Sequence, residues 1–271
     1  MSLGWKIDRT ICGTRLSLTP QQSPVSQSSF LPLPGESEFS SPPALVNSLL
    51  QLELGLSAFV TDLRYITDVI RADVGLTVQL LRLAAVELGK SPARVAPLSE
   101  IVLLLGVDKL KQLVARTKPI ADHSMRSAAS GECTRFWMHS RLTASIAEEL
   151  ASQSSEVFAE EAYLAGLFFR LGNLPLQLGR SSSSDLRSSD IHTSDVLGSD
   201  VHTRHTGYRM AMAWAFPRPL LDVIAGDREI CHRKSRVLLD IVEAADSWAL
   251  RLRALANRES ARTGQACRIT H

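Results

Sequence analysis

The segment EEAYLAGLFFRLGNLPL at residues 160–176 decides the fold of this chain. It follows FWMHSRLTASIAEELA at residues 136–151, where apolar side chains recur every three to four positions. That spacing puts the apolar side chains on one face of an α-helix, which is typical of a helix packed against a core. We therefore expect a block of packed helices over this part of the chain.

The same helical periodicity extends outward in both directions. On the N-terminal side, DVGLTVQLLRLAAVEL occupies residues 73–88, and Asp73 can accept hydrogen bonds from the free N–H groups of the first turn. On the C-terminal side, residues 208–217 and 234–255 continue the pattern. There is little strand signal after residue 20, so the sequence predicts an all-α fold. Three tryptophans on apolar helix faces are expected to anchor the core: Trp137, Trp214 and Trp248.

The pattern divides the chain into four parts. Residues 1–43, rich in Ser, Pro and Gln toward their end, are predicted to be an irregular arm, with a short hairpin near its start as an alternative. Residues 44–130 form an N-terminal helical lobe. Residues 131–256 form a second lobe, which contains a Ser-rich loop at residues 181–205. Residues 257–271 are a polar tail that we expect to be frayed.

Composition excludes several classes of function. Of the 271 residues, 45% are hydrophobic and 21% are charged, which is ordinary for a globular protein. The 30 basic and 28 acidic residues leave a net charge of +2, so no global field would hold a nucleic-acid backbone or an anionic membrane. A helical nucleic-acid binder would need a local basic face.

Localisation and redox state follow from what the sequence lacks. It has no apolar run long enough to span a bilayer and no secretory signal, so we expect a cytoplasmic protein. Gly-rich phosphate loops and nucleophile-elbow motifs are also absent. Four widely separated cysteines without metal-ligand spacing are interpreted as reduced thiols: Cys12, Cys133, Cys231 and Cys267.

Six segments, in the same order, resemble the motifs of the HDOD family, HD-related output domains of bacterial signalling proteins. They extend over about 200 residues. The segments are ADVGLTVQLLRLA (72–84), LSEIVLLLGVDKLKQLV (98–114), FWMHS (136–140), EEAYLAGLFFRLGNLPL (160–176), GYRMAMAWAFPRPLLDVI (207–224) and RVLLDIVEAADSWA (236–249). The resemblance implies a two-lobed helical bundle of HD-domain-like architecture.

The resemblance also locates the remains of a metal site. HD-domain phosphohydrolases, to which this family is related, bind divalent ions through a His, an adjacent His-Asp pair and a distant Asp. The His-Asp pair would fall at Phe169 and Arg170, so only His139 and Asp246 keep ligand side chains. A phenyl ring has no lone pair to donate, and a guanidinium is a permanent cation. We therefore predict no catalytic metal and no other cofactor.

Simpler roles are also open for these four vestigial positions. His139 lies on an apolar face and is interpreted first as a core histidine bonded to a backbone carbonyl. Asp246 would need a donor if buried, so a structural ion pair is its expected role. One hypothesis is that Arg170 replaces the lost cation and pairs with Asp246 while Phe169 fills the space of the imidazole. The alternative is that Arg170 points to solvent.

The Ser-rich loop contains a short internal echo, SDIHT at 189–193 and SDVHT at 199–203, followed by His205. We interpret it as a solvated loop. An accessory metal site and a phosphorylated or partner-recognised segment are the alternatives.

These observations lead to one expected function and one rival. The expected function is a non-catalytic regulatory module of a bacterial signalling pathway that binds a protein partner or a small ligand in the groove between its lobes. The rival is a divalent-metal phosphohydrolase that acts on a nucleotide or a cyclic dinucleotide. The residues at positions 169 and 170 argue against the rival.

Overall fold

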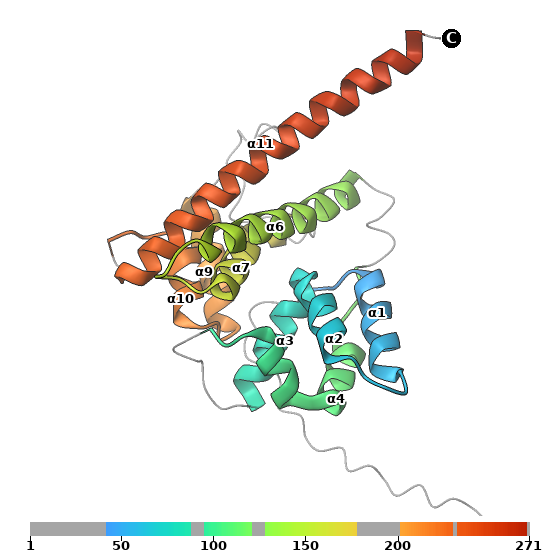
Figure 1. Cartoon of the computed structure of the whole chain (residues 1–271), viewed down its shortest axis with the longest axis vertical. Coiled ribbons are helices and arrows are strands. Elements are labelled where there is room, and N and C mark those ends of the chain that lie inside the picture. The colour runs from blue at the N-terminus through green and yellow to red at the C-terminus, as the bar shows by residue number, and fades with distance from the viewer. Residues whose placement is uncertain (1–41, 88–94, 121–127, 178–200, 230–231, 270–271) are drawn as a thin grey trace, which may run out of the picture. The chain divides into compact units, whose positions relative to one another are not determined.

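A computed structural model describes residues 42–87, 95–120, 128–177, 201–229 and 232–269, all within one compact unit, Leu33–His271 (Figure 1). Side chains are described for these residues except 128–133, 176–177, 201–202 and 259–269. The described backbone is helical, and its one β feature is a parallel bridge between Ala44 and Pro119. The all-α fold predicted from periodicity is confirmed.

The N-terminal lobe contains four helices. They are α1 (Val46–Ser57), α2 (Leu63–Arg71), α3 (Val74–Glu87) and α4 (Leu98–Arg116). Within α4 the backbone leaves helical geometry at Gly106, where φ is 74°, a value that favours glycine because it has no Cβ. The helix therefore bends at this point.

The second, HD-like lobe contains the remaining helices. They are α6 (Ala128–Ser152), α7 (Ala159–Phe168), the 3-10 turn η1 (Leu171–Asn173), α8 (Leu174–Gln177), α9 (Val201–Ala213), α10 (Arg218–Ala225) and α11 (Arg233–Ile269). The green helix α6 and the red helix α11 run side by side in Figure 1, and α6 also packs against α7. These three helices position the candidate site.

Asp73 joins the start of the described chain to α3. Its fully buried carboxylate accepts a hydrogen bond of 3.0 Å from the Leu76 N–H, as expected for a residue that caps this helix. The other carboxylate oxygen accepts a bond of 2.8 Å from the N–H of Leu45, just before α1. One side chain thereby satisfies N–H groups at the starts of two helices.

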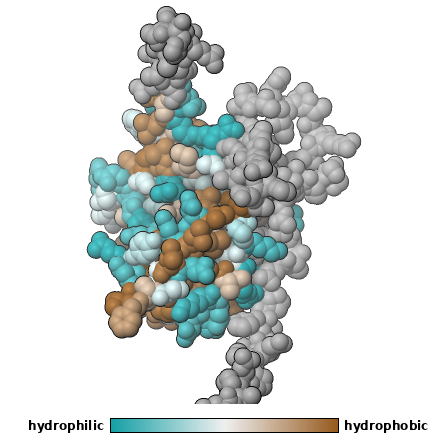
Figure 2. Space-filling view, turned by 90° about the vertical axis from the view of Figure 1, so that its right-hand side faces the viewer, coloured by the Kyte–Doolittle hydropathy of each residue, from teal (hydrophilic) through white to brown (hydrophobic). Residues whose placement is uncertain are grey.

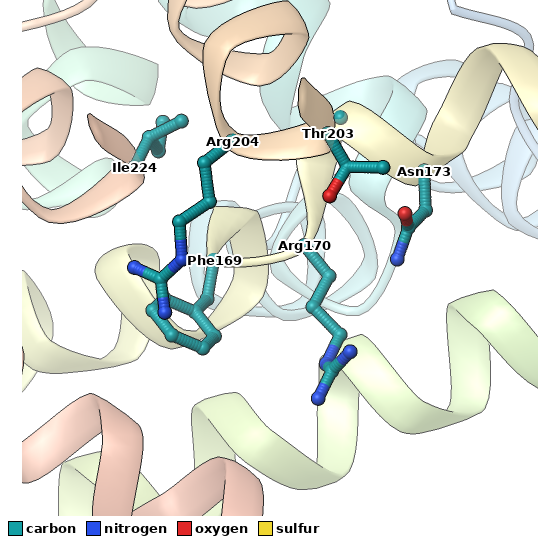
Figure 3. Close-up of a pocket in the computed structure, with 7 residues that line it drawn as sticks. Phe169, Arg170, Asn173, Thr203, Arg204 and Ile224 are labelled. Carbon is teal, nitrogen blue, oxygen red and sulfur yellow. The ribbon is translucent and has the colours of Figure 1, made fainter. Parts of the chain in front are cut away.

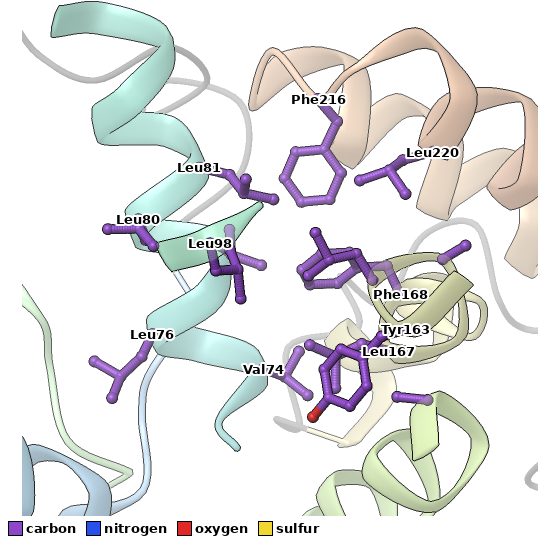
Figure 4. Close-up of a cluster of buried hydrophobic side chains, with 14 of the residues drawn as sticks. Val74, Leu76, Leu80, Leu81, Leu98, Tyr163, Leu167, Phe168, Phe216 and Leu220 are labelled. Carbon is purple, nitrogen blue, oxygen red and sulfur yellow. The ribbon is translucent and has the colours of Figure 1, made fainter. Parts of the chain in front are cut away.

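The two lobes share one hydrophobic core. Leu81 of α3 points toward Phe216, which precedes α10, and Val74 of the same helix points toward Tyr163 of α7 (Figure 4). Phe168 and Phe216 pack with their ring centroids 4.8 Å apart. The lobes predicted from the sequence therefore meet across apolar surface, which favours a fixed arrangement of the helices around the site.

Close backbone contact fixes α9 against η1. A Cβ atom added to Gly172 would lie 1.7 Å from the backbone oxygen of Thr203, so only glycine fits there. This contact explains a correction to the predicted loop over residues 181–205. The last five residues of that predicted loop belong to α9, because the helix begins at Val201 and packs against Gly172 through the backbone of Thr203.

Two other expectations need correction. The polar tail after residue 256, expected to be frayed, is helical as far as Ile269, because it continues α11 without a proline. Trp137 and Trp214 are core residues as predicted, but Trp248 is 54% exposed and stacks with Arg251 at 5.9 Å. An indole on an apolar face can lie at the edge of the core.

Several expectations lie outside the described residues or side chains. They concern the arm and hairpin over residues 1–41, the repeat over 189–200 and the four cysteine thiols. Of the histidines near that repeat, His205 has a described side chain, which is exposed on α9.

One described surface is partly apolar. Figure 2 shows brown apolar side chains gathered among teal polar ones on the face that lies at the right of Figure 1. On α1, which lies on that side, Val46, Leu50 and Leu54 recur every four residues and are all exposed. The core-facing stripe of the same helix is formed by other residues, including Leu52 and Leu56.

Candidate functional site

Three helices bring the four vestigial positions together. His139 lies in the middle of α6, Phe169 and Arg170 directly follow α7, and Asp246 lies on α11. The helix α7 ends at Phe168, and Arg170 then leads into the 3-10 turn η1. The chain turn after α7 thus directs the Arg170 side chain toward α6 and α11.

Arg170 pairs with Asp246 through two parallel hydrogen bonds. Its Nε donates to Oδ1 at 2.7 Å, and its Nη2 donates to Oδ2 at 2.6 Å. Both side chains are only 8% exposed. A planar guanidinium matches both oxygens of a carboxylate, which gives a charge-assisted pair with a fixed geometry. The structure therefore places Arg170 against Asp246, as the first hypothesis predicted, and not toward solvent.

His139 completes the cluster. Its Nε2 lies 2.9 Å from Oδ1 of Asp246, and the ring is 1% exposed. An ionised carboxylate only accepts hydrogen bonds, so Nε2 must carry the proton. His139 is thus a core histidine as expected, but its partner is a carboxylate instead of the backbone carbonyl that we predicted. Packing α11 against α6 brings that carboxylate within reach.

Electrostatics keeps Asp246 ionised. Burial alone would raise the pKa of its carboxyl group, but hydrogen bonds from Arg170 and then His139 outweigh burial and lower the pKa to about 2. The two positive guanidinium N–H donors stabilise the charged carboxylate specifically. At neutral pH the Asp246 carboxylate is therefore ionised and paired with the Arg170 guanidinium.

Phe169 fills the space beside this pair. Its ring is 7% exposed, and the guanidinium of Arg204 lies 4.8 Å from the ring centroid (Figure 3). Arg204 also contacts Glu243 of α11 at 3.4 Å. A neighbouring cavity lined by Arg170, Asn173 and Thr203 among others has a volume of about 10 Å³, room for about one water molecule. The sequence analysis missed Arg204 because nothing in the local pattern of α9 signals a stacked arginine.

The donor set of this cluster does not fit a divalent cation. Both oxygens of Asp246 are engaged by Arg170, and a second positive charge would be repelled at that position. Phe169 offers no ligand atom. In the described part of the chain, no group of three or more His, Cys, Asp or Glu side chains is placed to hold a metal ion.

A larger groove lies at the boundary between the lobes, and we call it the interlobe groove. Its volume is about 360 Å³, within the range of small-molecule sites. The residues that line it come from α2 and α4 of the N-terminal lobe and from α7: Leu63, Arg64, Thr67, Asp68, Arg71, Ser99 and Glu160. Sequence reasoning predicted a groove between the lobes but named none of these residues.

Polar contacts between the lobes hold the groove walls. Glu160 of α7 accepts a hydrogen bond of 3.2 Å from the N–H of Leu98, at the start of α4. Tyr163 donates through its hydroxyl to the carbonyl of Arg71 at 3.0 Å, and the Arg71 guanidinium stacks 3.7 Å from the Tyr163 ring. Arg71 also pairs with Glu148 of α6. The groove is therefore a defined feature of the packed lobes.

Comparison with known proteins identifies the family. The chain matches the HDOD domain family over residues 42–230, which is more than half of its length, and it belongs to that family. No curated protein matches the chain. None of the described helices is long and apolar enough to cross a membrane.

Solved structures with the same fold include two crystal structures of the MmoQ response regulator from Methylococcus capsulatus strain Bath. The first is 20% identical, with a TM-score of 0.58, and the match covers 83% of this chain and 93% of that one. The second, a fragment of residues 20–298, is 18% identical, with a TM-score of 0.54, covering 81% and 91%. At these identities the similarity establishes a common fold.

The Arg170–Asp246 pair makes a testable contribution to stability. In a double-mutant cycle with Arg170→Ala and Asp246→Asn, we expect a coupling of more than about 1 kcal/mol in the free energy of unfolding, because both groups are buried. The control is the Arg228–Asp240 pair, which is of similar length at 2.7 Å but has both side chains more than half exposed. Its coupling should be a few tenths of a kcal/mol. Equal couplings in the two cycles would contradict a buried pair.

Acid should remove the stabilisation supplied by Asp246. A carboxyl group whose pKa falls from 3.8 to about 2 on folding stabilises the folded protein above pH 4, and this contribution disappears as the pH falls toward 2. The shift corresponds to about 2 kcal/mol. We therefore expect the difference in unfolding free energy between the native protein and Asp246→Asn to shrink steadily from pH 4.5 to pH 2.5, measured by urea titration. A constant difference would show that the pKa is not lowered.

Proposed function

We propose that this HDOD protein is a non-catalytic signalling module that binds a protein partner or a small ligand in the interlobe groove. The observation that carries the proposal is the bidentate bond between Arg170 and Asp246. It engages the carboxylate that, by resemblance to the HD phosphohydrolases, would bind the catalytic ion. The fold relative MmoQ bears the name of a response regulator, which supports a role in signalling.

The rival function is metal-dependent phosphohydrolysis of a nucleotide or cyclic dinucleotide. It would require an ion bound by His139 and Asp246 together with two further ligands. Phe169 and Arg170 supply neither ligand, and two protein ligands rarely suffice for a catalytic metal site. The non-catalytic function needs no such ion, and stoichiometric metal in the native protein would favour the rival.

The interlobe groove supports the binding part of the proposal. Its lining includes two cationic side chains, Arg64 and Arg71, and two anionic ones, Asp68 and Glu160, so the charges balance. Such a site suits a ligand or peptide with polar groups of both signs. Because residues of both lobes line the groove, an occupant would contact both lobes at once.

A photo-crosslinking experiment in the source cell tests this binding site. A benzophenone amino acid at Asp68, which is exposed in the groove, should form one discrete adduct that mass spectrometry can identify. The matched control is the same amino acid at Lys111, which is also exposed on a helix of the N-terminal lobe but lies outside the groove.

A second variant excludes accidental crosslinking. Adding Ser99→Trp to the Asp68 probe protein fills the groove and should abolish the adduct, because Ser99 lines the groove and is exposed. Adducts that are the same at Asp68 and Lys111, or that persist with Ser99→Trp, would contradict the proposed site.

A further inference from the structure

Helix α11 carries a stripe of exposed apolar side chains, which we call the α11 stripe. It consists of Trp248, Leu252 and Leu255, which follow one another at intervals of four and three residues and so share one face of the helix. Their side chains are 54%, 44% and 55% exposed. Other residues of the helix, such as Val242 and Ala249, are fully buried in the core. The α11 stripe is therefore a second apolar face, apart from the one that packs into the protein.

Beyond the stripe, the described side chains of α11 have no packed face. Every side chain from Ala254 to Arg258 is exposed, and the backbone remains helical as far as Ile269. Figure 1 shows this end of the red helix α11 extending beyond the end of α6. Helices in proteins are stabilised mainly by packing of an apolar face, because short helices are only marginally stable in water. An exposed apolar stripe on such a helix indicates that a partner packs along it.

The width of the stripe favours another helix as that partner. Intervals of four and then three residues match the d, a and d positions of the heptad repeat through which two helices pack side by side. A helix that lies on a membrane surface has a broader apolar face. The α11 stripe is narrow, because arginines border it at positions 251 and 258.

These two arginines give the surface its charge. In the same register, Arg251 and Arg258 both occupy g positions, where charged side chains select the partner helix. Both are exposed, and neither forms an ion pair with a described acidic side chain. Arg251 instead stacks on the Trp248 ring at 5.9 Å. The border of the stripe is therefore positively charged and uncompensated by the described residues.

A second copy of α11 would not supply the opposite charge. In an antiparallel pair the g positions face each other, so Arg251 and Arg258 would meet arginines. In a parallel pair a g position faces an e position, and Arg251 would meet the neutral Ala256. A helix with aspartate or glutamate beside its apolar side chains would pair with both arginines.

We propose that the α11 stripe docks an amphipathic helix of another protein, one that carries acidic side chains along the border of its apolar face. The two apolar stripes pack together and exclude water, which supplies most of the affinity. The acidic side chains pair with Arg251 and Arg258, which selects the partner and its register.

This surface is separate from the family module and from the interlobe groove. The family match ends at residue 230, and α11 begins at Arg233. None of the residues of the α11 stripe lines the interlobe groove. Helix docking on α11 can therefore fail or succeed independently of binding in that groove.

Fluorescence anisotropy of two labelled peptides tests the proposal on the full chain. Each peptide has about four heptads with leucine at the a and d positions, and the e and g positions carry glutamate in one peptide and lysine in the other. We expect the glutamate peptide to bind saturably, and at least about tenfold more tightly than the lysine peptide. No saturable binding of the glutamate peptide, or equal affinities for the two peptides, would overturn the proposal.

A pair of leucine variants locates the binding. Leu252→Gln together with Leu255→Gln should weaken binding of the glutamate peptide by about tenfold or more, because it removes the apolar contact. The matched control is Leu50→Gln together with Leu54→Gln on α1, where the leucines are 51% and 71% exposed. Both variants should keep the native melting temperature, and the control should keep the native affinity. Unchanged affinity in the α11 variant would contradict docking on this stripe.

Charge reversal tests the selection of an acidic partner. In the variant Arg251→Glu with Arg258→Glu, the preference should reverse, so that the lysine peptide binds more tightly than the glutamate peptide. The reversal cannot arise from a merely structural role of the two arginines, because a loss of structure would weaken both peptides alike. A retained preference for the glutamate peptide would overturn the proposal.

Two further measurements identify the other occupants of such a surface. Sedimentation velocity of the full chain would show a second copy as the occupant if a dimer is present and is lost in Leu252→Gln with Leu255→Gln. Co-sedimentation with vesicles of phosphatidylcholine and phosphatidylserine would show a membrane as the occupant if the same variant abolishes binding. We expect neither result, and either one would overturn the proposal.

Discussion

A carboxylate that is buried away from water must be paired with hydrogen-bond donors. In this protein the buried carboxylate of Asp246 imposes that requirement on the helices around it. Its two oxygens accept three hydrogen bonds, from Arg170 at 2.7 and 2.6 Å and from His139 at 2.9 Å. These donors come from the end of α7 and from α6, so one side chain of α11 ties together the three helices that pack most extensively in the HD-like lobe. In metal-binding relatives an ion would have that role by resemblance; here a permanent cation of the chain supplies the charge.

The same principle organises the N-terminal lobe with a different solution. Asp73 is fully buried, and its donors are neutral groups, first among them the backbone N–H groups of Leu45 and Leu76. Burial raises the pKa of Asp73, whereas the guanidinium lowers that of Asp246. The contrast has a physical cause, since a fixed positive charge stabilises a buried carboxylate more than neutral donors do. Asp73 thus caps the starts of two helices, whereas Asp246 stabilises the vestigial site.

Much of this could be predicted from the sequence, for identifiable reasons. Helical periodicity gave the all-α class, and the order of the motifs gave the family. The pairing of Arg170 with Asp246 followed from chemistry, because a buried acid needs a donor. Trp248, the start of α9 and the partner of His139 were predicted wrongly, because each depends on how one helix packs against another. The residues that line the interlobe groove required the structure, since they are far apart in the sequence.

The central claim is that Arg170 takes the place of the metal ion at Asp246, and a metal titration tests it most directly. The native chain and the double variant Phe169→His with Arg170→Asp are each titrated with Mn²⁺ after treatment with a chelator. The account predicts no saturable binding to the native chain and a new site in the double variant, which is lost again when Asp246→Asn is added. Stoichiometric binding of Mn²⁺ to the native chain that depends on His139 and Asp246 would contradict it.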